Sequence, residues 1–319
     1  MDRPVVVIGS LNMDLVVRVP RMPAAGETLT GDGYATAPGG KGANQAVAVA
    51  RMGAPVAMVG CVGRDAHGAE LRAGLEADGI DTTQVRAHDD AHSGVAVIVV
   101  EATGQNRIVL APGANALLDA VAINFAGAMI ERAALVVLQL EVPLPTVLHA
   151  AKRARRVGVP VLLNAAPAVA LPDDLWQAID ILVVNESEAA LLAGTDVVDA
   201  DSAVRAAGAL RERGPATVIV TLGALGVVLV DAHGVIVQPA HAVTAIDTTA
   251  AGDTFIGAYA AARREGWSNA DALSLGQAAS ALCVTRRGAQ PSIPYRHELT
   301  GDYTPRPAGV PQPFTQGSR

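Results

Sequence analysis

The sequence is short of positive charge and of aromatic side chains. Lys and Arg number 24 against 31 Asp and Glu, the net charge is −7, and Phe, Trp and Tyr make up only 3% of the chain. A nucleic-acid-binding surface needs a basic patch and aromatic platforms for the bases, so nucleic acid is not an expected partner. An acidic protein that binds a polyphosphate must neutralise it locally, with backbone N–H groups, a metal ion and a few basic side chains.

Long apolar runs and a cysteine framework are also missing. No uninterrupted apolar stretch approaches the ~18 residues of a membrane span, so a membrane is not an expected partner. The amino end, Met1 to Pro4, leads directly into an apolar run without a basic leader or a cleavage site. Cys61 and Cys283 have no metal-type spacing, which favours buried free thiols in a reducing compartment. We therefore expect a cytoplasmic protein.

The order of apolar runs predicts an α/β fold. From residue 117 onward, short apolar runs alternate with helical patterns, which is typical of βα units and a parallel sheet. Segments 15–36 and 94–111 instead predict strands with no helix between them, forming a small antiparallel sheet, while residues 60–68 predict a loop. We expect one α/β domain over residues 1–300, with a central, mostly parallel sheet flanked by helices. The proline-rich segment 301–319 predicts a flexible tail.

The most informative stretch is Asp247 to Phe255. It follows a β-branched run, Val243 to Ile246, and precedes an alanine-rich helical pattern, which predicts a strand, a tight turn and a helix. Small residues where a helix begins leave backbone N–H groups free to bind an anion beside the positive end of the helix dipole. These residues are Ala250, Ala251 and Gly252. Asp253 would then place a proton acceptor at the edge of an anion hole, or would simply cap the helix.

Polar residues follow two of the expected strands. Asn12 and Asp14 come after the first strand, where they would meet a ligand at the carboxyl edge of the sheet or would cap a turn. Asn185 and Glu188 follow the strand at 181–184. Their oxygens suit magnesium or its waters, but a capping Asn with an ordinary first-turn Glu has the same pattern.

Two glycine-rich segments allow close approach of a ligand. The segment Gly39 to Asn44 is not a phosphate loop, because that pattern needs glycine at position 35 and Ser or Thr at position 42. Its glycines would let the backbone approach a ligand, with Lys41 and Asn44 forming hydrogen bonds. Gly223 and Gly226 would make room for a nucleotide, or would mark an ordinary hairpin.

Taken in order, these segments resemble the signatures of the ribokinase-like (PfkB-type) sugar kinases. The matching segments are Gly9 to Asp14, Gly39 to Asn44, Asn185 to Glu188, Asp247 to Phe255 and Thr285 to Ser292. The resemblance covers residues 4–299. It implies an ATP-dependent sugar kinase that uses magnesium and potassium. It also implies a small β lid over the sugar that serves as the contact of a homodimer.

The resemblance also assigns roles to single residues. Asp253 would be the base that accepts a sugar hydroxyl proton. The sugar would be held by Asn12, Asp14, Gly40, Lys41, Asn44 and Glu141. ATP would be held by Asn185, Thr221, Gly223, Gly226, Gly252 and Gln277, and magnesium by Asn185 and Glu188. Potassium would be held, in several cases through backbone carbonyls, by Asp247, Thr249, Cys283, Arg286, Gly288 and Ser292.

The expected substrate follows from the chemistry of the sugar contacts. All of them are polar or glycine, which favours a small polyol over a nucleoside, whose base would need an aromatic face. This points to D-ribose, phosphorylated at O5. A related kinase for another sugar or a nucleoside and a non-catalytic sugar-binding protein are the alternatives. A dinucleotide oxidoreductase is disfavoured, because the first strand does not lead into a Gly-x-Gly-x-x-Gly turn.

Overall fold

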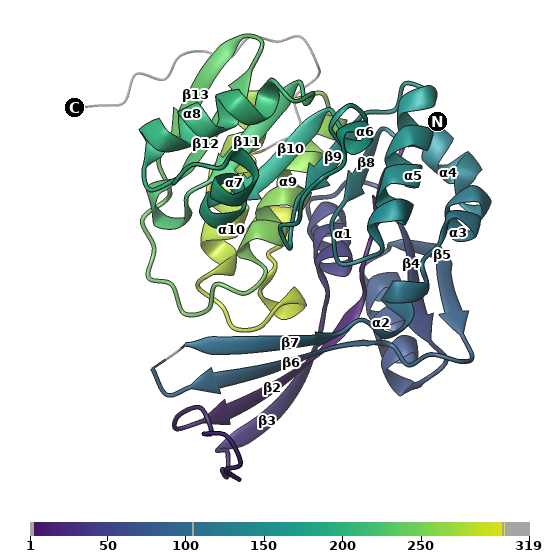
Figure 1. The fold of residues 1–319 in the computed structure, drawn as a ribbon, viewed down its shortest axis with the longest axis vertical. Coiled ribbons are helices and arrows are strands. Elements are labelled where there is room, and N and C mark those ends of the chain that lie inside the picture. Colours follow the sequence, from purple (N-terminus) through teal and green to yellow (C-terminus); the bar gives the residue numbers. More distant parts are fainter. Residues whose placement is uncertain (1–2, 104, 302, 304–319) are drawn as a thin grey trace.

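The computed structural model describes residues 3–103, 105–301 and 303. They form an α/β body with a small separate sheet projecting from it (Figure 1). The expected tail lies outside the described residues, apart from Gly301 and Tyr303. No helix in the described part of the chain is long and apolar enough to span a membrane.

A nine-stranded sheet forms the centre of the body. Its strands are β1 (Val5–Ile8), β4 (Val56–Gly63), β5 (Asp81–His88), β8 (Leu135–Leu138), β9 (Val161–Asn164), β10 (Ile181–Asn185), β11 (Thr217–Thr221), β12 (Val227–Asp231) and β13 (Gly234–Gln238). Their order is β13-β12-β11-β10-β9-β8-β1-β4-β5. Only the β11–β12 and β12–β13 pairs are antiparallel, which confirms the expected mostly parallel sheet.

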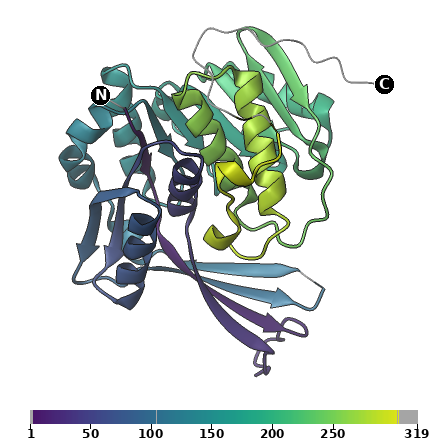
Figure 2. The same cartoon turned by 180° about the vertical axis from the view of Figure 1, so that it is seen from behind.

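Helices cover both faces of this sheet. One face carries α1 (Lys41–Arg51), α2 (Ala66–Ala77), α9 (Ala251–Arg264) and α10 (Asn269–Cys283), which Figure 2 shows in purple-blue and yellow-green. The other face carries α3 (Ala120–Phe125), α4 (Gly127–Glu131), α5 (Leu144–Arg156), α6 (Asp173–Trp176), α7 (Glu186–Ala193) and α8 (Ala200–Arg211). Successive residues of β1 enter opposite cores, Val5 and Val7 one and Val6 and Ile8 the other. Burial on both faces explains why the central strands read as continuous apolar runs.

The small sheet, which we call the lid, has four strands. They are β2 (Asn12–Val19), β3 (Gly33–Gly39), β6 (Gly94–Glu101) and β7 (Asn106–Ala111). Two antiparallel pairs, β2–β3 and β6–β7, lie side by side through a parallel β2–β6 pairing. Asn12 and Asp14 therefore lie on a strand that leads from the body into the lid, rather than in a loop. Short 3₁₀ turns complete the fold at Gly113–Leu117, Gly223–Leu225, Gln290–Ser292 and Arg296–Glu298.

The expected loop over residues 60–68 is wrong in its first half. Residues 60–63 are the buried end of β4. The glycines at positions 60 and 63 allow close packing and do not form a turn. A Cβ on Gly60 would lie 2.5 Å from the Leu11 side chain, and a Cβ on Gly63 would lie 2.5 Å from the Ala91 carbonyl oxygen.

The expected strand at Val243 to Ile246 is also wrong. These residues form an exposed loop, and the backbone N–H groups of Ile246 and Asp247 both bond to the Val284 carbonyl at the end of α10. The following turn is therefore fixed by α10 and not by a strand. The helix after the turn, α9, begins at Ala251.

Candidate active site

The carboxyl ends of the parallel strands bring the predicted residues together. A cavity of about 210 Å³ lies at this edge of the sheet. It is lined by Lys41, Asn164, Asn185, Glu188, Thr221, Ala250, Ala251, Gly252 and Asp253, among others. The predicted anion hole, the predicted base, and part of the ATP and magnesium sets thus share one space. Gly223, Gly226 and Gln277 do not line it.

The 250–253 turn has the form expected of an anion hole. Ala250 precedes α9 with φ 60° and ψ 8°, and no described side chain caps the helix. It is the only non-glycine residue with positive φ in the described chain. Strain of this kind is typical of functional sites. The uncapped first turn leaves amides available to an anion at the positive end of the helix dipole.

Asp253 does not cap α9. It is the third residue of the helix, it is buried, and its carboxylate points toward α1. Its Oδ2 accepts a hydrogen bond from Asn44 Nδ2 at 3.0 Å, and its Oδ1 accepts one from Gln45 Nε2 at 2.9 Å. Asn44 Oδ1 is buried and has no partner among the described residues, so it is free to accept a hydroxyl. The capping alternative for Asp253 is excluded.

Glu141 organises the side of the site below the lid. One of its oxygens, Oε2, accepts hydrogen bonds from Ser10 Oγ at 2.6 Å, from the Lys41 backbone N–H at 3.1 Å and from Asn12 Nδ2 at 3.5 Å. Asn115 Nδ2 donates to Asn12 Oδ1 at 2.8 Å. Asn12, Asn115 and Glu141 line a further cavity of about 310 Å³. The strand after β1, the start of α1 and the segment after β8 thus meet around one carboxylate.

Asp14 lies buried on β2, close to the other carboxylates. Burial and, to a smaller extent, the charges of Glu141 and Asp253 together raise the pKa of Asp14 to about 7. Asp14 also lines a cavity of about 330 Å³ between the lid and the loops that carry Asp247 and Arg287. A buried carboxylate with a raised pKa has lost the water that would stabilise its charge. Hydrogen bonds donated by sugar hydroxyls would replace that water and favour the ionised form.

Lys41 keeps its charge at the start of α1. Burial lowers the pKa of Lys41, but the carboxylates of Asp253, Glu141 and Glu188 outweigh burial, so its pKa is raised overall. The glycine before it has φ 88°, and a Cβ on Gly40 would lie 2.7 Å from the Asn12 backbone nitrogen. Gly40 is thus required where α1 begins against β2.

Asn185 and Glu188 form a complete capping box at the start of α7. Asn185 Oδ1 accepts from the Glu188 N–H, and Glu188 Oε2 accepts from the Asn185 N–H, both at 2.9 Å. Burial is the main cause of a raised pKa of Glu188. Each side chain therefore caps the helix and also lines the cavity, so the two alternatives drawn from the sequence are compatible.

The other predicted nucleotide residues lie around β12 and β13. Gly226 has φ 111°, and a Cβ there would lie 2.0 Å from the Gln238 carbonyl oxygen, so glycine is required by the packing of the hairpin. Gly223 has open space around it beyond the Glu186 carboxylate. Gln277 Nε2 donates to the Pro239 carbonyl at 3.0 Å, which places it beside the end of β13.

The predicted potassium residues come from two segments that lie against each other. Asp247 Oδ1 accepts from Thr249 Oγ1 at 2.6 Å, and Asp247 Oδ2 accepts from the Gly288 N–H at 3.0 Å. Although burial raises the pKa of Asp247, these hydrogen bonds outweigh burial and lower it overall. Cys283 Sγ lies 3.1 Å from Ser292 Oγ. The Arg286 guanidinium pairs with Glu298, so only the main chain of Arg286 is left for a cation.

Several residues of the site were missed from the sequence. They are Ser10, Gln45, Asn115, Gln139 and Asn164. Gln139 directly follows β8 and Asn164 ends β9, so the strand-end rule that selected Asn12 and Asn185 could have found both. Within the described chain, no group of three or more His, Cys, Asp or Glu side chains could hold a metal ion.

Comparisons with known proteins identify the family of the chain. The pfkB family carbohydrate kinase profile matches residues 2–296. Ribokinase of Haemophilus influenzae is 45% identical over 298 residues, which cover 93% of this chain and 97% of that protein. Ribokinase of Schizosaccharomyces pombe is 42% identical over 313 residues, with 94% and 97% covered. The structure of Arabidopsis thaliana ribokinase complexed with ribose and ATP matches with a TM-score of 0.88 at 35% identity, covering 93% of this chain and 97% of that one. The chain therefore belongs to the pfkB family of carbohydrate kinases.

Proposed function

We propose that the chain catalyses ATP-dependent phosphorylation of D-ribose at O5, giving ribose 5-phosphate. The single observation that carries this proposal is the buried Asp253 carboxylate beside the uncapped start of α9, within one cavity. The similar proteins named ribokinase support ribose as the sugar. Phosphoryl transfer asks a protein mainly for positioning and for stabilisation of charge, and this corner of the site offers both.

The residues of the site have separate roles in the proposed reaction. Asp253 accepts the O5 proton as the hydroxyl attacks, a contribution of ~10²- to 10⁴-fold in rate. Amides of the 250–253 turn stabilise charge on the transferring phosphoryl group, each preorganised donor contributing ~10²- to 10³-fold. Lys41, with its raised pKa, keeps a positive charge in the same cavity. Magnesium, held with ATP near Asn185 and Glu188, would neutralise phosphate charge.

The lining of the sugar site supports a small polyol. Asn12, Asp14, Gly40, Lys41, Asn44 and Glu141 would hold the sugar. No aromatic side chain is among the described residues that line the two cavities at Asp253 and Glu141. A nucleoside base would lack a stacking face there. A kinase for another sugar would share the base and the anion hole, so a substrate panel separates the two.

The Asp253→Asn variant tests the proposed base. This isosteric change keeps the volume but removes the proton acceptor, so we expect kcat to fall about a hundredfold or more while ATP still binds. ADP release should be measured in a coupled assay with pentoses, hexoses and nucleosides. Asp174→Asn is the matched control, because Asp174 only pairs with Lys152 on the surface. Near-normal turnover of Asp253→Asn would exclude Asp253 as the base, and no ADP release by the wild type with any sugar would favour a sugar-binding protein.

A potassium ion would brace the anion hole from behind. Its ligands would be the main-chain and side-chain oxygens of Asp247, Thr249, Cys283, Arg286, Gly288 and Ser292. The two segments that carry them are held together by the Asp247–Gly288 hydrogen bond, and Thr249 directly precedes the anion-hole turn. We expect activity to be higher in potassium chloride than in sodium chloride at equal ionic strength. Equal rates in the two salts would rule out the site.

The lid would also join two copies of the chain. The sheet pairing places Tyr34, Val97 and Val109 on one face of the lid, opposite the face whose Asp14, Val16 and Ile98 line the cleft toward the body. Tyr34, Val97 and Val109 are 65%, 38% and 69% exposed. Exposed apolar side chains gathered on one face are typical of an interaction surface, and a second lid would cover them. The two buried free thiols, Cys61 and Cys283, support a reducing, cytoplasmic setting for this dimer.

A further inference from the structure

We propose that Gln139 and Gln45 form a relay of side-chain amides that orients the Asp253 carboxylate for catalysis. Neither glutamine is needed to hold the sugar or ATP in the proposed function. The inference rests on the proposed role of Asp253 as the base. Gln45 and Gln139 act through Asp253, so they are positioning residues.

A continuous chain of hydrogen bonds links the three side chains. Gln139 Nε2 donates to Gln45 Oε1 at 2.7 Å, and Gln45 Nε2 donates to Asp253 Oδ1 at 2.9 Å. Gln45 Nε2 also lies 3.2 Å from Asn164 Oδ1, and the Asn164 amide donates in turn to the Val183 carbonyl. Both glutamines are fully buried. Both amides are therefore shielded from solvent water.

The relay has only one self-consistent direction. An ionised carboxylate can only accept hydrogen bonds, so Gln45 must turn its NH₂ group toward Asp253. Its carbonyl oxygen then faces Gln139, which must turn its own NH₂ group toward Gln45. The Gln139 donor thus holds the Gln45 amide in the one orientation that an ionised Asp253 can accept. With Asn44 on Oδ2 and Gln45 on Oδ1, both oxygens of Asp253 are held, and each keeps a lone pair for a substrate hydroxyl.

Packing alone does not account for an amide at position 139. Gln139 Oε1 is buried and has no partner among the described residues, which disfavours the folded state. The chain also keeps glycine at position 9 to leave it room, because a Cβ there would lie 1.8 Å from that oxygen. An apolar side chain of similar length would fill the space without an unpaired atom. The amide is explained by the hydrogen bond that its NH₂ group donates to Gln45 Oε1.

The helices that carry the relay are held unusually close. Gly257 lies one turn after Asp253 on α9, and a Cβ there would lie 2.3 Å from Ala48 Cβ and 2.7 Å from the Gln45 carbonyl oxygen on α1. Because Gly257 contributes no side chain to this contact, α1 and α9 pack close enough for Gln45 to reach Asp253 directly. Placement on two packed helices and one strand end gives the base a fixed geometry, which loops would not give.

The decisive variant is Gln139→Met, which preserves the length of the side chain but removes the donor. We expect kcat to fall roughly 10- to 100-fold, with the KM values for sugar and ATP unchanged within about twofold, because only the aim of the base is disturbed. The melting temperature should change little, since Gln139→Met removes one unpaired buried oxygen, Gln139 Oε1, and leaves another, Gln45 Oε1, without its donor. Gln45→Met should lower kcat at least as much. Gln177→Met, at an exposed glutamine, is the matched control and should change nothing.

A double-variant cycle then separates positioning from a general structural effect. In the Asp253→Asn background, Gln139→Met should cause no further loss of kcat, as measured by the residual turnover of labelled ATP. The proposal is overturned if Gln139→Met keeps wild-type kcat, if its loss persists in full in the Asp253→Asn background, or if it lowers kcat together with the melting temperature. Failure of the proposed function looks different: Asp253→Asn itself would then stay active.

Discussion

Asp14 shows how one residue of the site opposes the stability of the unliganded fold. Its carboxylate is buried on the lid strand β2, and its pKa is raised to about 7 by burial and then by Glu141 and Asp253. The ionised form is thus less favourable in the folded chain than in the unfolded one. The cost is absent below pH ~4, grows as the pH rises through the interval between the two pKa values, and is complete above pH ~7. Sugar hydroxyls would compensate for it on binding.

The variant Asp14→Asn should therefore be more stable than the wild type but lose sugar affinity. The pKa shift corresponds to roughly 1–4 kcal/mol of unfolding free energy at pH 8, because a neutral amide has no ionisation to suppress. The gain should shrink between pH 7 and pH 4 and vanish at pH ~4. Thermal unfolding of the ligand-free protein across this pH range, with sugar titrations at pH 8, measures both effects. If the stability gain of Asp14→Asn over the wild type were smaller at pH 8 than at pH 5, the direction of the Asp14 pKa shift would be contradicted.

The site residues that could be predicted from the sequence are those whose neighbours in the chain form a recognisable local pattern. The turn at 250–252 and Asp253 were predictable because small residues, a carboxylate and a helix start are adjacent in the chain. Gln45 was not, since its role depends on a partner 208 residues away. Gln139 lies at a predictable strand end, but its role depends on Gln45, 94 residues away. A glutamine after the first turn of a helix has no pattern of its own. Only the packing of α1 against α9 makes it part of the site.

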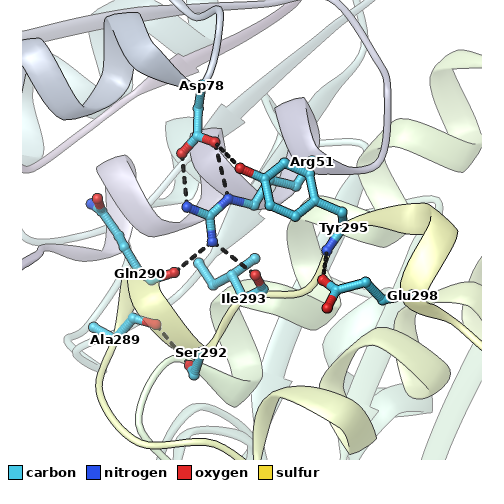
Figure 3. A network of polar contacts seen from close by, with 8 residues as sticks. All are labelled: Arg51, Asp78, Ala289, Gln290, Ser292, Ile293, Tyr295 and Glu298. Carbon is cyan, nitrogen blue, oxygen red and sulfur yellow. Dashed lines mark hydrogen bonds and ion pairs between the residues drawn. The ribbon is translucent and has the colours of Figure 1, made fainter.

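At the scale of elements, one arginine joins three separate segments behind the site. Arg51 ends α1, and Figure 3 shows its guanidinium against Asp78 at the end of α2 and against the carbonyls of Gln290 and Ile293. The Tyr295 ring lies 4.9 Å from the guanidinium carbon, and its hydroxyl donates to Asp78. The segment held in this way includes Ser292 and follows Gly288, both predicted potassium ligands. Arg51 thus links the helix that begins at the proposed sugar site to the proposed cation loop.

Loss of this arginine should be costly. The Arg51 and Asp78 side chains are only 15% and 10% exposed, so Arg51→Met leaves a carboxylate and two carbonyls partly buried without their donor. We expect a loss of about 2–4 kcal/mol in unfolding free energy. Arg72→Met is the matched control, because its i,i+4 pair with Glu76 is exposed and should contribute less than about 0.5 kcal/mol. Denaturant unfolding of both variants measures the two losses of unfolding free energy. Equal losses would show that Arg51 does not hold the three segments together.

The elements that sequence reasoning misjudged share a physical cause. The β-branched residues at 243–246 indicated a strand, but they join neither described sheet, and the Ile246 and Asp247 N–H groups bond to the Val284 carbonyl at the end of α10. Glycines at 60 and 63 indicated a loop, but they make room for Leu11 and for the Ala91 backbone within a strand. Both errors arose because local propensity was used where tertiary contacts decide. The long βα units after residue 117 were predictable because their periodicity and their burial agree.

At the scale of the whole molecule, the lid is exposed on the side away from the site. The sheet order leaves β3 and β7 as its two edges, and Tyr34, Val97 and Val109 lie on one apolar face. The opposite face lines the cleft to the body, with Asp14 in it. Contact of two lids through the apolar face would hold each lid in place over its own sugar site. Oligomeric state and sugar affinity should then change together.

The variant Val109→Asp should convert the proposed dimer into a monomer. A carboxylate at this central position of β7 would lose its hydration in a lid–lid contact, and an unpaired buried charge is strongly unfavourable. We expect sedimentation velocity to give the mass of a single chain, with a higher KM for the sugar and little change in ATP binding. Val235→Asp is the matched control, since Val235 is 51% exposed on the body strand β13 and faces no lid. A wild-type chain that sediments as a monomer, or a Val109→Asp variant that stays dimeric, would show that the apolar face of the lid is not the contact.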